Sequence, residues 1–374
     1  MDHTLYDFAV IGAGMAGASI AAELAPYAKV LVLEGEDAPG YHSTGRSAAF
    51  WEECYGGPGV VPLTLASGEY LREHGFLSQR GALYVGRGED KAAMDGFVDR
   101  FSGTGVTIER LGRDGIKQRV PWLREEWCDA IWEPVCSDID VAGLHQHYLK
   151  AIRQAGVKLV CRAMVERFER EAGGWRITTQ AGGTYRAAKI VNAAGAWADT
   201  IAARAGANPI GIQPLRRTVA QLRVAPDAPP DLPLVLDISG GFYFKSDNGR
   251  LWLSPHDEVP TEPCDAAPEE IDVARAIDTF ERVTDWTIEA VERRWAGLRS
   301  FAPDRLPVYG ADAEVDGFIW FAGQGGFGIQ TAPAAARLGA QIMLGLEADA
   351  LTRRIDTSIY APARFAGQKA AHAH

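Results

Sequence analysis

A glycine triplet near the N-terminus constrains the fold of this chain more than any other feature. Gly12, Gly14 and Gly17 have the G-x-G-x-x-G spacing, between an apolar run at residues 5–11 and a helical pattern at 20–25. The apolar run predicts a buried parallel strand. In this setting the three glycines permit a tight turn, a close approach of backbone to pyrophosphate, and close packing of helix on strand. The alternative is a glycine-rich turn that only tightens packing.

An acidic residue follows the next predicted strand. Residues 29–33, KVLVL, are followed directly by Glu34, which lies 20 positions past Gly14. A carboxylate at that position can accept hydrogen bonds from both ribose hydroxyls. Strand, glycines, helix, strand and acid together predict a bound dinucleotide with an unphosphorylated adenosine ribose.

Composition excludes several classes of protein. A net charge of −11 over 374 residues argues against a nucleic-acid surface. Five scattered cysteines without a C-x-x-C pair fit a reducing cytoplasm, and eight histidines without H-E-x-x-H indicate no metal site. Asp7 and Glu23 interrupt the one stretch, residues 5–25, that approaches the length of a membrane helix. We therefore expect a cytoplasmic protein without an integral membrane segment.

Later apolar runs predict that the nucleotide-binding domain is interrupted and resumed. Residues 189–197 and 317–322 read as further strands of the first sheet, and each is followed by small residues, glycine and a helix. Residues 183–187 read as a separate strand of an antiparallel meander, and 104–140 as irregular. Residues 212–254 are rich in short strands separated by turns, which is typical of an antiparallel sheet.

The predicted class is α/β, or α+β in two domains, with a Rossmann-like nucleotide domain and an interleaved, mostly antiparallel substrate domain. The predicted boundaries are 1–75, 143–211 and 296–374 for the first domain, and 76–142 and 212–295 for the second.

Two further loops have the composition of ligand-binding turns. Residues 37–49, DAPGYHSTGRSAA, supply hydroxyl and arginine donors, with small residues that leave room for a flat ring. Residues 323–330, GQGGFGIQ, join a strand to a helix N-terminus, so the backbone can approach a ligand. The alternatives are a surface loop with local hydroxyl-to-backbone bonds and a turn that only packs helix on strand.

Five motifs together resemble one family of flavoenzymes. GAGMAGAS, GYHSTGRSAA, VNAAGAW, WAGLRSF and GQGGFGIQ, in this order, resemble the D-amino-acid oxidase family, and most closely its bacterial D-amino-acid dehydrogenases of the D-arginine dehydrogenase type. The resemblance covers nearly the whole chain. It implies FAD, held without a covalent bond because the last cysteine is Cys264, whereas the related sarcosine oxidases use a cysteine late in the chain.

The resemblance also implies a set of cofactor contacts. They are the dinucleotide turn, the acid on the ribose, a loop that wraps the pyrophosphate and ring, a backbone contact to adenine, and a turn that lines the flavin. The residues are Gly12, Gly14, Ala16, Gly17, Glu34, Ser43, Thr44, Gly45, Arg46, Ser47, Ala48, Ala49, Phe50, Val165, Gly195, Trp197, Gly325, Gly326, Phe327, Gly328, Ile329 and Gln330.

Substrate contacts follow from the same resemblance. Arg299 and Arg217 match arginines that bind the substrate carboxylate, whose geometry and charge suit a guanidinium fork. Tyr55 and Tyr243 match tyrosines that close over the substrate, and Gln330 can fix substrate or flavin. The alternatives are a structural ion pair for Arg299, a solvated charge for Arg217, and a core position for Tyr243.

The chain departs from the D-arginine branch at two positions. Ala82 stands where those relatives carry a glutamate that would pair with a cationic side chain, and Phe50 stands where they carry a histidine. Together with Trp51, these residues predict a less polar pocket and neutral or apolar substrates.

The resemblance implies oxidative deamination of D-amino acids, by hydride transfer from Cα to flavin N5, to an imino acid that water hydrolyses to a 2-oxo acid and ammonia. A second reading is oxidation of a secondary amine such as sarcosine, glycine or a proline derivative, and a third is oxidation of a 2-hydroxy acid. A flavin-binding protein without turnover is a reading of another class. The electron acceptor is a quinone, an electron-transfer protein or oxygen, and a quinone would allow peripheral contact with the inner membrane.

Overall fold

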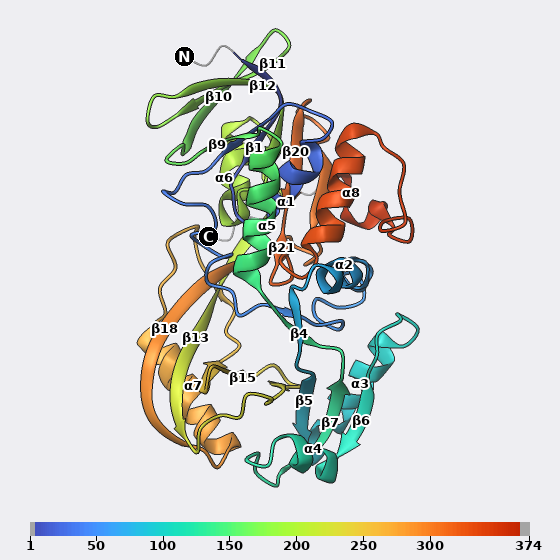
Figure 1. Ribbon diagram of the computed structural model, residues 1–374, viewed down its shortest axis with the longest axis vertical. Coiled ribbons are helices and arrows are strands. Elements are labelled where there is room, and N and C mark those ends of the chain that lie inside the picture. The colour runs from blue at the N-terminus through green and yellow to red at the C-terminus, as the bar shows by residue number, and fades with distance from the viewer. Residues whose placement is uncertain (1–3, 367–374) are drawn as a thin grey trace.

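The computed structural model describes residues 4–366, which form two large β-sheets and one small sheet (Figure 1). The first sheet and its helices occupy one end of the long axis, and the second sheet occupies the other. The ends of the predicted first domain, residues 1–3 and 367–374, lie outside the described residues.

The first sheet has the glycine turn at its centre. Strand β1 pairs in parallel with β12 on one side and with β2 on the other, and β9 continues the sheet beyond β2. Strand β2 and most of β1 are buried on both faces, which explains their continuous apolar sequences. The strands are β1 (Leu5–Ile11), β2 (Val30–Leu33), β9 (Lys158–Val160), β10 (Val165–Glu171), β11 (Gly174–Thr179), β12 (Thr184–Asn192), β19 (Val308–Ala311) and β20 (Phe318–Ala322).

Strand β12 corrects one prediction. The segments 183–187 and 189–192 are not two strands but one, because no glycine or proline interrupts residues 184–192. Its first half pairs with the antiparallel β11 and its second half with the parallel β20. The antiparallel meander is therefore an extension of the nucleotide sheet.

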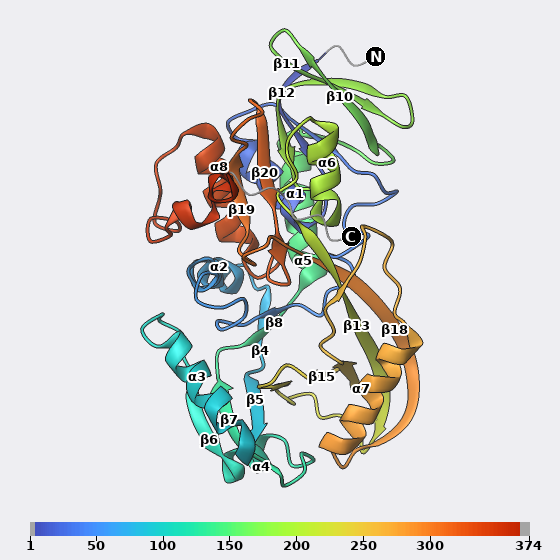
Figure 2. The ribbon, with the colours of Figure 1, turned by 180° about the vertical axis from the view of Figure 1, so that it is seen from behind.

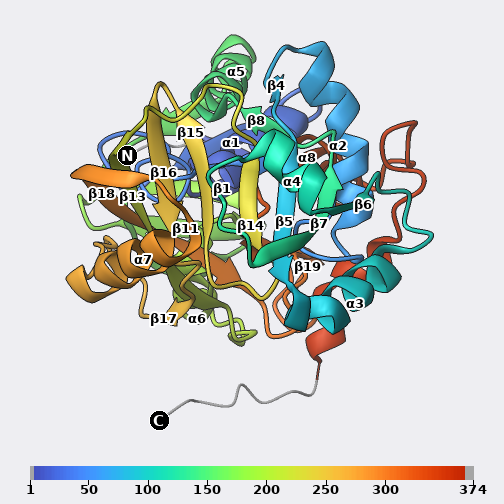
Figure 3. The same ribbon diagram turned by 90° about the horizontal axis from the view of Figure 1, so that it is seen from below.

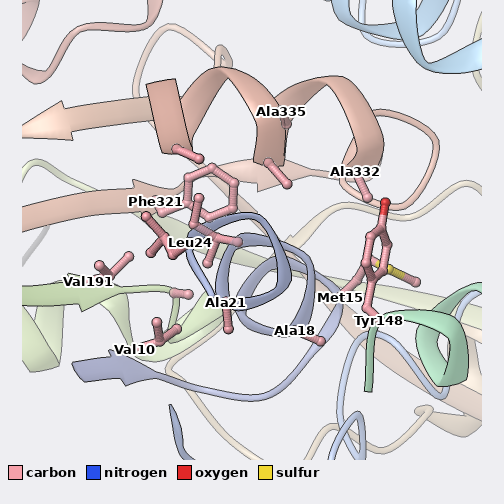
Figure 4. Packing of buried hydrophobic residues seen from close by; sticks show 14 of the residues in the cluster. Val10, Met15, Ala18, Ala21, Leu24, Tyr148, Val191, Phe321, Ala332 and Ala335 are labelled. Carbon is pink, nitrogen blue, oxygen red and sulfur yellow. The ribbon is translucent and has the colours of Figure 1, made fainter. Parts of the chain in front are cut away.

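Helices cover both faces of the first sheet. Helix α1 (Met15–Leu24) lies between the sheet and helices α5 (Val141–Gln154) and α8 (Ala332–Leu344). Its small side chains allow this close packing, as Figure 4 shows for Ala18 and Ala21. The helix begins at Met15 rather than near residue 20, since Gly14 is already its N-cap. Helix α6 (Ala198–Arg204) covers the other face.

The second sheet is built on two long antiparallel strands, β13 and β18, which curve along one side of the molecule (Figures 1 and 2). All its pairs are antiparallel except β14 with β5, which lie side by side in the view from below (Figure 3). Helix α7 (Glu270–Val283) packs on it. Its strands are β5 (Ala82–Arg87), β6 (Glu109–Gly112), β7 (Trp127–Glu133), β13 (Gln213–Ala225), β14 (Leu234–Asp237), β15 (Tyr243–Asp247), β16 (Arg250–Ser254), β17 (Val259–Pro260), β18 (Thr287–Phe301) and β21 (Gln324–Gly325).

Residues 104–140 are ordered, so the prediction of an irregular segment was wrong. They contain β6, β7, β8 (Ser137–Ile139) and helix α4 (Arg113–Arg119). The alternating strand pattern is broken in this segment, because Trp127 and Trp132 are five positions apart and yet both pack against the core of the second sheet, with an irregularity in the pairing of β7 near Trp127. Strand β8 joins β3 (Phe50–Trp51) and β4 (Leu77–Gln79) in the small sheet.

The remaining helices are α2 (Val61–Glu73) and α3 (Lys91–Phe101), with short 3-10 turns at Gly88–Asp90, Gly195–Trp197, Thr357–Tyr360 and Pro362–Phe365. Among the described residues, no helix combines the length and the apolar character needed to cross a bilayer. The domain boundaries given above stay a prediction.

Candidate active site

One long cavity joins the two large sheets. At one end it touches the carboxyl ends of β1 and β2, and at the other it touches β13, β15 and β18. The unfilled space along the cavity and its mouth is about 1600 Å³. Ligands of open α/β sheets bind outside the carboxyl ends of the strands, so this cavity is the candidate site.

The glycine turn forms the floor of the first end. Gly12 has φ of +100°, and a Cβ there would lie 2.7 Å from the Ala193 carbonyl oxygen. A Cβ on Gly17 would collide with the Gly12 carbonyl oxygen, although Gly17 itself does not line the cavity. The first glycine is therefore required by the turn, and the last by the packing of α1 on β1.

Polar side chains at this end are already bonded to the protein. The Glu34 carboxylate accepts hydrogen bonds from the Ala13 N–H at 2.7 Å and the Glu36 N–H at 2.9 Å. The Thr44 hydroxyl accepts one from the Met15 N–H at 2.9 Å, at the start of α1. Glu34 and Thr44 both line the cavity, so they hold fixed positions at its wall.

The loop at residues 43–48 is fastened to the second sheet. The Ser43 hydroxyl donates to the Leu298 carbonyl at 2.7 Å, and the Trp295 indole donates to the Arg46 carbonyl at 3.0 Å. Arg46 donates to the Ala266 carbonyl at 2.8 Å and pairs with Asp265. These side chains fix the loop, whose Ser47 and Ala48 line the cavity between the sheets.

Sequence reasoning missed two histidines that support this end. His145 on α5 donates from Nε2 to the Ala13 carbonyl at 2.9 Å, and burial lowers its pKa, which favours the neutral ring. His42 packs against Trp197 with ring centroids 4.7 Å apart and bonds to Glu36 at 2.9 Å. No motif marks His145. The GYHSTGR loop was the available signal for His42.

The second end of the cavity carries two arginines. Arg299 on β18 lines the cavity, and no hydrogen bond or ion pair of its guanidinium is found among residues 4–366. Its guanidinium lies 5.6 Å from the ring centroid of Tyr55. The structural ion pair considered for Arg299 is therefore not present in the described part of the chain. A half-buried cation facing a cavity without a partner suits an anionic ligand.

Arg217 on β13 is 4% exposed, so it is not a solvated charge. Its Nε donates to the Asp257 carbonyl at 2.6 Å, and its Nη2 lies 3.4 Å from Glu258 Oε1, but its Nη1 is buried with no partner in the described structure. Burial, and then the charge of Arg299, lower its pKa to about 10. Arg217 therefore stays charged at neutral pH and presents one unused donor.

Two tyrosines flank the arginines. Tyr243 lines the cavity, with its ring centroid 6.0 Å from the Arg217 guanidinium, while Phe242 and Phe244 face the core of the second sheet. The Tyr55 hydroxyl is buried without a partner among the described residues, and burial raises its pKa. Tyr55 lies behind the lining, where a Cβ on Gly326 would meet its hydroxyl oxygen.

Some predicted residues lie outside the lining. The Gln330 amide is buried and bonded to the protein, donating to Thr64 Oγ1 at 2.8 Å and to the Glu52 carbonyl at 3.2 Å. It holds the chain beside the site rather than facing the cavity, which was not expected. The predicted residues absent from the lining are Gly17, Gly45, Ala49, Phe50, Tyr55, Phe327 and Gln330.

The structure brings the other predicted residues together at the cavity. Val165 lines it with its carbonyl accepting a hydrogen bond from Arg204. The residues are Gly12, Gly14, Ala16, Glu34, Ser43, Thr44, Arg46, Ser47, Ala48, Val165, Gly195, Trp197, Arg217, Tyr243, Arg299, Gly325, Gly326, Gly328 and Ile329.

The shape and chemistry of this cavity fit FAD. It is elongated, with a glycine turn and a carboxylate at one end and small residues at the other, where Ala48 and Gly325 leave space for a ring. No cysteine is found in its lining, and the described residues contain no cluster of three histidine, cysteine or acidic side chains that could hold a metal ion.

Comparisons with known proteins agree with this geometry. The family model described as "FAD dependent oxidoreductase", DAO, matches residues 7–342. Hydrogen cyanide synthase subunit HcnC of Pseudomonas aeruginosa is 25% identical over 98% of both chains. Two solved structures share the fold. L-proline dehydrogenase from P. horikoshii has a TM-score of 0.83 at 24% identity, over 96% of this chain and 98% of that one. Glycine oxidase from Geobacillus kaustophilus has a TM-score of 0.81 at 23% identity, over 95% and 98%.

These relatives confirm the two-sheet α/β fold but carry different activities in their names, so the narrower resemblance to D-amino-acid dehydrogenases is not established by them. The family match spans most of the chain, from the first strand to the last long helix. The chain belongs to the DAO family of FAD-dependent oxidoreductases, and FAD is its cofactor.

Proposed function

We propose that this protein oxidises amino acids at the carbon that bears the amine, with neutral or apolar D-amino acids as its first substrates. The observation that carries the proposal is the unpaired Arg299 guanidinium beside the free Nη1 of Arg217, at the ring end of the cavity.

The two arginines would bind the substrate carboxylate. A carboxylate accepts two parallel hydrogen bonds from a guanidinium, and Arg299 has its donors free for this among the described residues. Arg217 Nη1 and the Tyr55 hydroxyl are the other unpartnered donors in this region. This group of free donors, two of them on cations, suits a carboxylate, which accepts several hydrogen bonds and carries a negative charge.

Bound FAD supplies the two-electron oxidant for the Cα–H bond. The protein would hold the carboxylate, and so fix which face of Cα points to the ring. Tyr243, which lines the cavity, would help to exclude water from the reacting carbon. The product imino acid is hydrolysed by water to a 2-oxo acid and ammonia.

The cofactor would be held without a covalent bond, since Cys264 is exposed and absent from the lining. The lining residues around the glycine turn, Glu34 and the 43–48 loop would hold the adenosine and pyrophosphate, and Gly325 to Ile329 would border the flavin.

We propose substrates with uncharged side chains because the charged residue beside Phe50, Lys245, is already paired within the protein. Ala82 is fully buried between β14 and β7, and Trp51 packs against α2, so neither forms the pocket wall. Phe50 is close to Tyr243, with Lys245 Nζ 4.8 Å from its ring centroid. Lys245 is paired with Asp138 at 2.9 Å, so it leaves no free charge for a charged side chain.

A second candidate is oxidation of a secondary amine that carries a carboxylate. The name of one structure with this fold, L-proline dehydrogenase, favours it, since proline is a secondary amine. The same arginines would bind the carboxylate. The electron acceptor would be a quinone, an electron-transfer protein or oxygen.

Anaerobic bleaching of the flavin tests the proposal. The purified yellow protein is mixed without oxygen with D-amino acids, their L-forms, sarcosine, proline, D-arginine and 2-hydroxy acids. Bleaching by apolar D-amino acids but not by L-forms is the expected result. Bleaching only by sarcosine or proline would favour the second candidate, and bleaching by none of them would favour a flavin protein without turnover.

A further inference from the structure

Three glutamates lie together beside the substrate end of the cavity. Glu133 accepts hydrogen bonds from the Glu53 N–H at 2.7 Å and the Cys54 N–H at 3.3 Å, and Glu53 accepts one from the Thr107 N–H at 2.7 Å. Glu52 is different. It is 2% exposed, and its Oε1 is buried with no hydrogen-bond partner in the described structure. The bonds that satisfy the other two carboxyl groups are missing at Glu52.

The main chain of Glu52 is held in place. Its N–H donates to Gln330 Oε1 at 3.2 Å, and its carbonyl accepts from Gln330 Nε2 at 3.2 Å. Gln330 is fixed in turn by Thr64 of α2 at 2.8 Å. The backbone of Glu52 is therefore fixed by buried hydrogen bonds, each of which is costly to leave unmade, so its carboxyl stays within one side-chain length of this point.

The charged neighbours of Glu52 oppose one another. Burial, and then the carboxylate of Glu133 on β7, raise the pKa of Glu52 well above its usual range, while Arg299 on β18 lowers it. No ion pair joins Glu52 and Arg299 among the described residues, but Arg299 is the cation whose charge would stabilise an ionised Glu52. The other titratable groups that interact with Glu52 are Tyr55, Cys54 and Cys136.

We propose that Glu52 is a positioning residue that acts through Arg299. Its carboxyl must hold a proton for Arg299 to bind the substrate carboxylate, and once ionised it competes with the substrate for the same guanidinium. The proposal rests on the role of Arg299 in the proposed function. The ionised Glu52 carboxylate, behind the cavity wall, would thus compete with the substrate carboxylate for Arg299.

The proton balance follows directly. When Glu52 ionises, its O–H bond breaks and the proton goes to solvent. Binding a carboxylate ligand to that form reverses the step, so one proton returns from solvent to Glu52. The apparent affinity for a carboxylate must then fall as pH rises through the pKa of Glu52, by up to about tenfold per pH unit.

Propionate is the probe, because it has a carboxylate but no amine that titrates in this range. Its dissociation constant is measured with the FAD-bound protein by the change in flavin absorbance, from pH 6 to 9, a range in which Arg217, with its pKa of about 10, stays mostly charged. The wild type should bind more weakly with rising pH, and E52Q, which keeps the shape of the neutral carboxyl, should show no such slope. E53Q is the matched control, because it removes a neighbouring carboxyl that does not face Arg299, and it should keep the wild-type slope.

Proton uptake by the wild type gives a second readout that needs no variant. In weak buffer with a pH indicator, propionate binding on the alkaline side of the slope should take up about one proton per site. A flat wild-type profile, an unchanged slope in E52Q, or no proton uptake would overturn the proposal. Propionate binding requires no turnover, so failure of every amino acid to bleach the flavin would contradict the proposed function and leave this test intact.

Discussion

The two ends of the cavity differ in whether their polar groups are already hydrogen-bonded to the protein. At the glycine-turn end, the Glu34 carboxylate and the Thr44 hydroxyl are bonded to backbone N–H groups. At the substrate end, Arg217 Nη1, the Tyr55 hydroxyl and Glu52 Oε1 are buried without partners among the described residues. Unpaired buried polar groups are expensive.

The difference shows which end is prepared for which kind of ligand. A cofactor that stays bound is received by a rigid wall whose side chains are already fixed. A substrate that comes and goes is received by donors that lack partners until it arrives. If this comparison is right, substitutions at the first end should affect folding and flavin content, and those at the second should affect substrate binding alone.

The largest expected effect is at the first end, in Gly17→Ala. The new Cβ would collide with the Gly12 carbonyl oxygen, so α1 must move from β1. We expect a loss of several kcal/mol of stability, on the order of the cost of overpacking or more, and loss of flavin from the purified protein. Flavin absorbance per protein and the melting temperature measure both.

The control for this variant is Gly96→Ala. Gly96 is also helical, in α3, and a Cβ there has no heavy atom within 4 Å. This change should raise stability by up to about 1 kcal/mol. An equally stable Gly17→Ala protein with full flavin would contradict the packing role of Gly17.

At the second end, Arg299→Ala should lower kcat/KM at least about 30-fold, because removing one side of a buried charged hydrogen bond costs about 2–5 kcal/mol. The flavin content should not change. The control is Arg293→Ala on the same strand, where the side chain is exposed. Steady-state kinetics gives kcat/KM for both variants. If kcat/KM fell by the same factor in both, Arg299 would not be the residue that binds the substrate carboxylate.

Adjacent arginines on β13 sharpen the comparison further. Arg217→Ala should weaken carboxylate binding about 10-fold to 100-fold, since its Nη1 is one of the free donors. Arg216 pairs with Glu269 at 2.5 Å and Asp272 at 3.0 Å on the other face of the strand. Arg216→Ala should lower the melting temperature and leave propionate affinity nearly unchanged. The reverse pattern would place the ligand on the other face.

The smallest effect is expected for Tyr55→Phe, about 3-fold to 10-fold in KM, the value of one hydrogen bond of about 0.5–1.5 kcal/mol. Tyr309 also has a buried hydroxyl without a partner in the described structure, but it lies outside the cavity. Tyr309→Phe should leave KM unchanged and should not destabilise the protein. Equal effects in KM would mean that the Tyr55 hydroxyl has no special access to substrate.

The sequence predicted the first end of the cavity better than the second. The glycine spacing, the following acid and the apolar strands are local patterns, and they located β1, β2 and the turn between them. The strands of residues 104–140 were missed, because they pair with distant segments and carry one buried and one half-buried tryptophan. Long-range pairing leaves a weaker local pattern than a buried parallel strand does.

At the substrate end, the family motif identified Arg299, but the environment of each residue depends on strand register. Arg216 and Arg217 are neighbours on one strand and so lie on opposite faces, but only the structure settles that Arg217 is the one at the cavity. Glu52 carried no motif at all. The role proposed for Glu52 depends on its burial and on its missing hydrogen bond, and neither can be predicted from the sequence.

We call the proposed binding of the substrate carboxylate by Arg299 and Arg217 the arginine clamp. Its most direct test compares an amino acid with the same molecule without its carboxylate. Anaerobic bleaching of the FAD-bound wild type is followed with D-phenylalanine and with 2-phenylethylamine at equal concentrations. If Arg299 and Arg217 bind the substrate through its carboxylate, D-phenylalanine should bleach the flavin and 2-phenylethylamine should bleach it at least about 100-fold more slowly. Equal rates of bleaching by the two compounds would contradict the clamp.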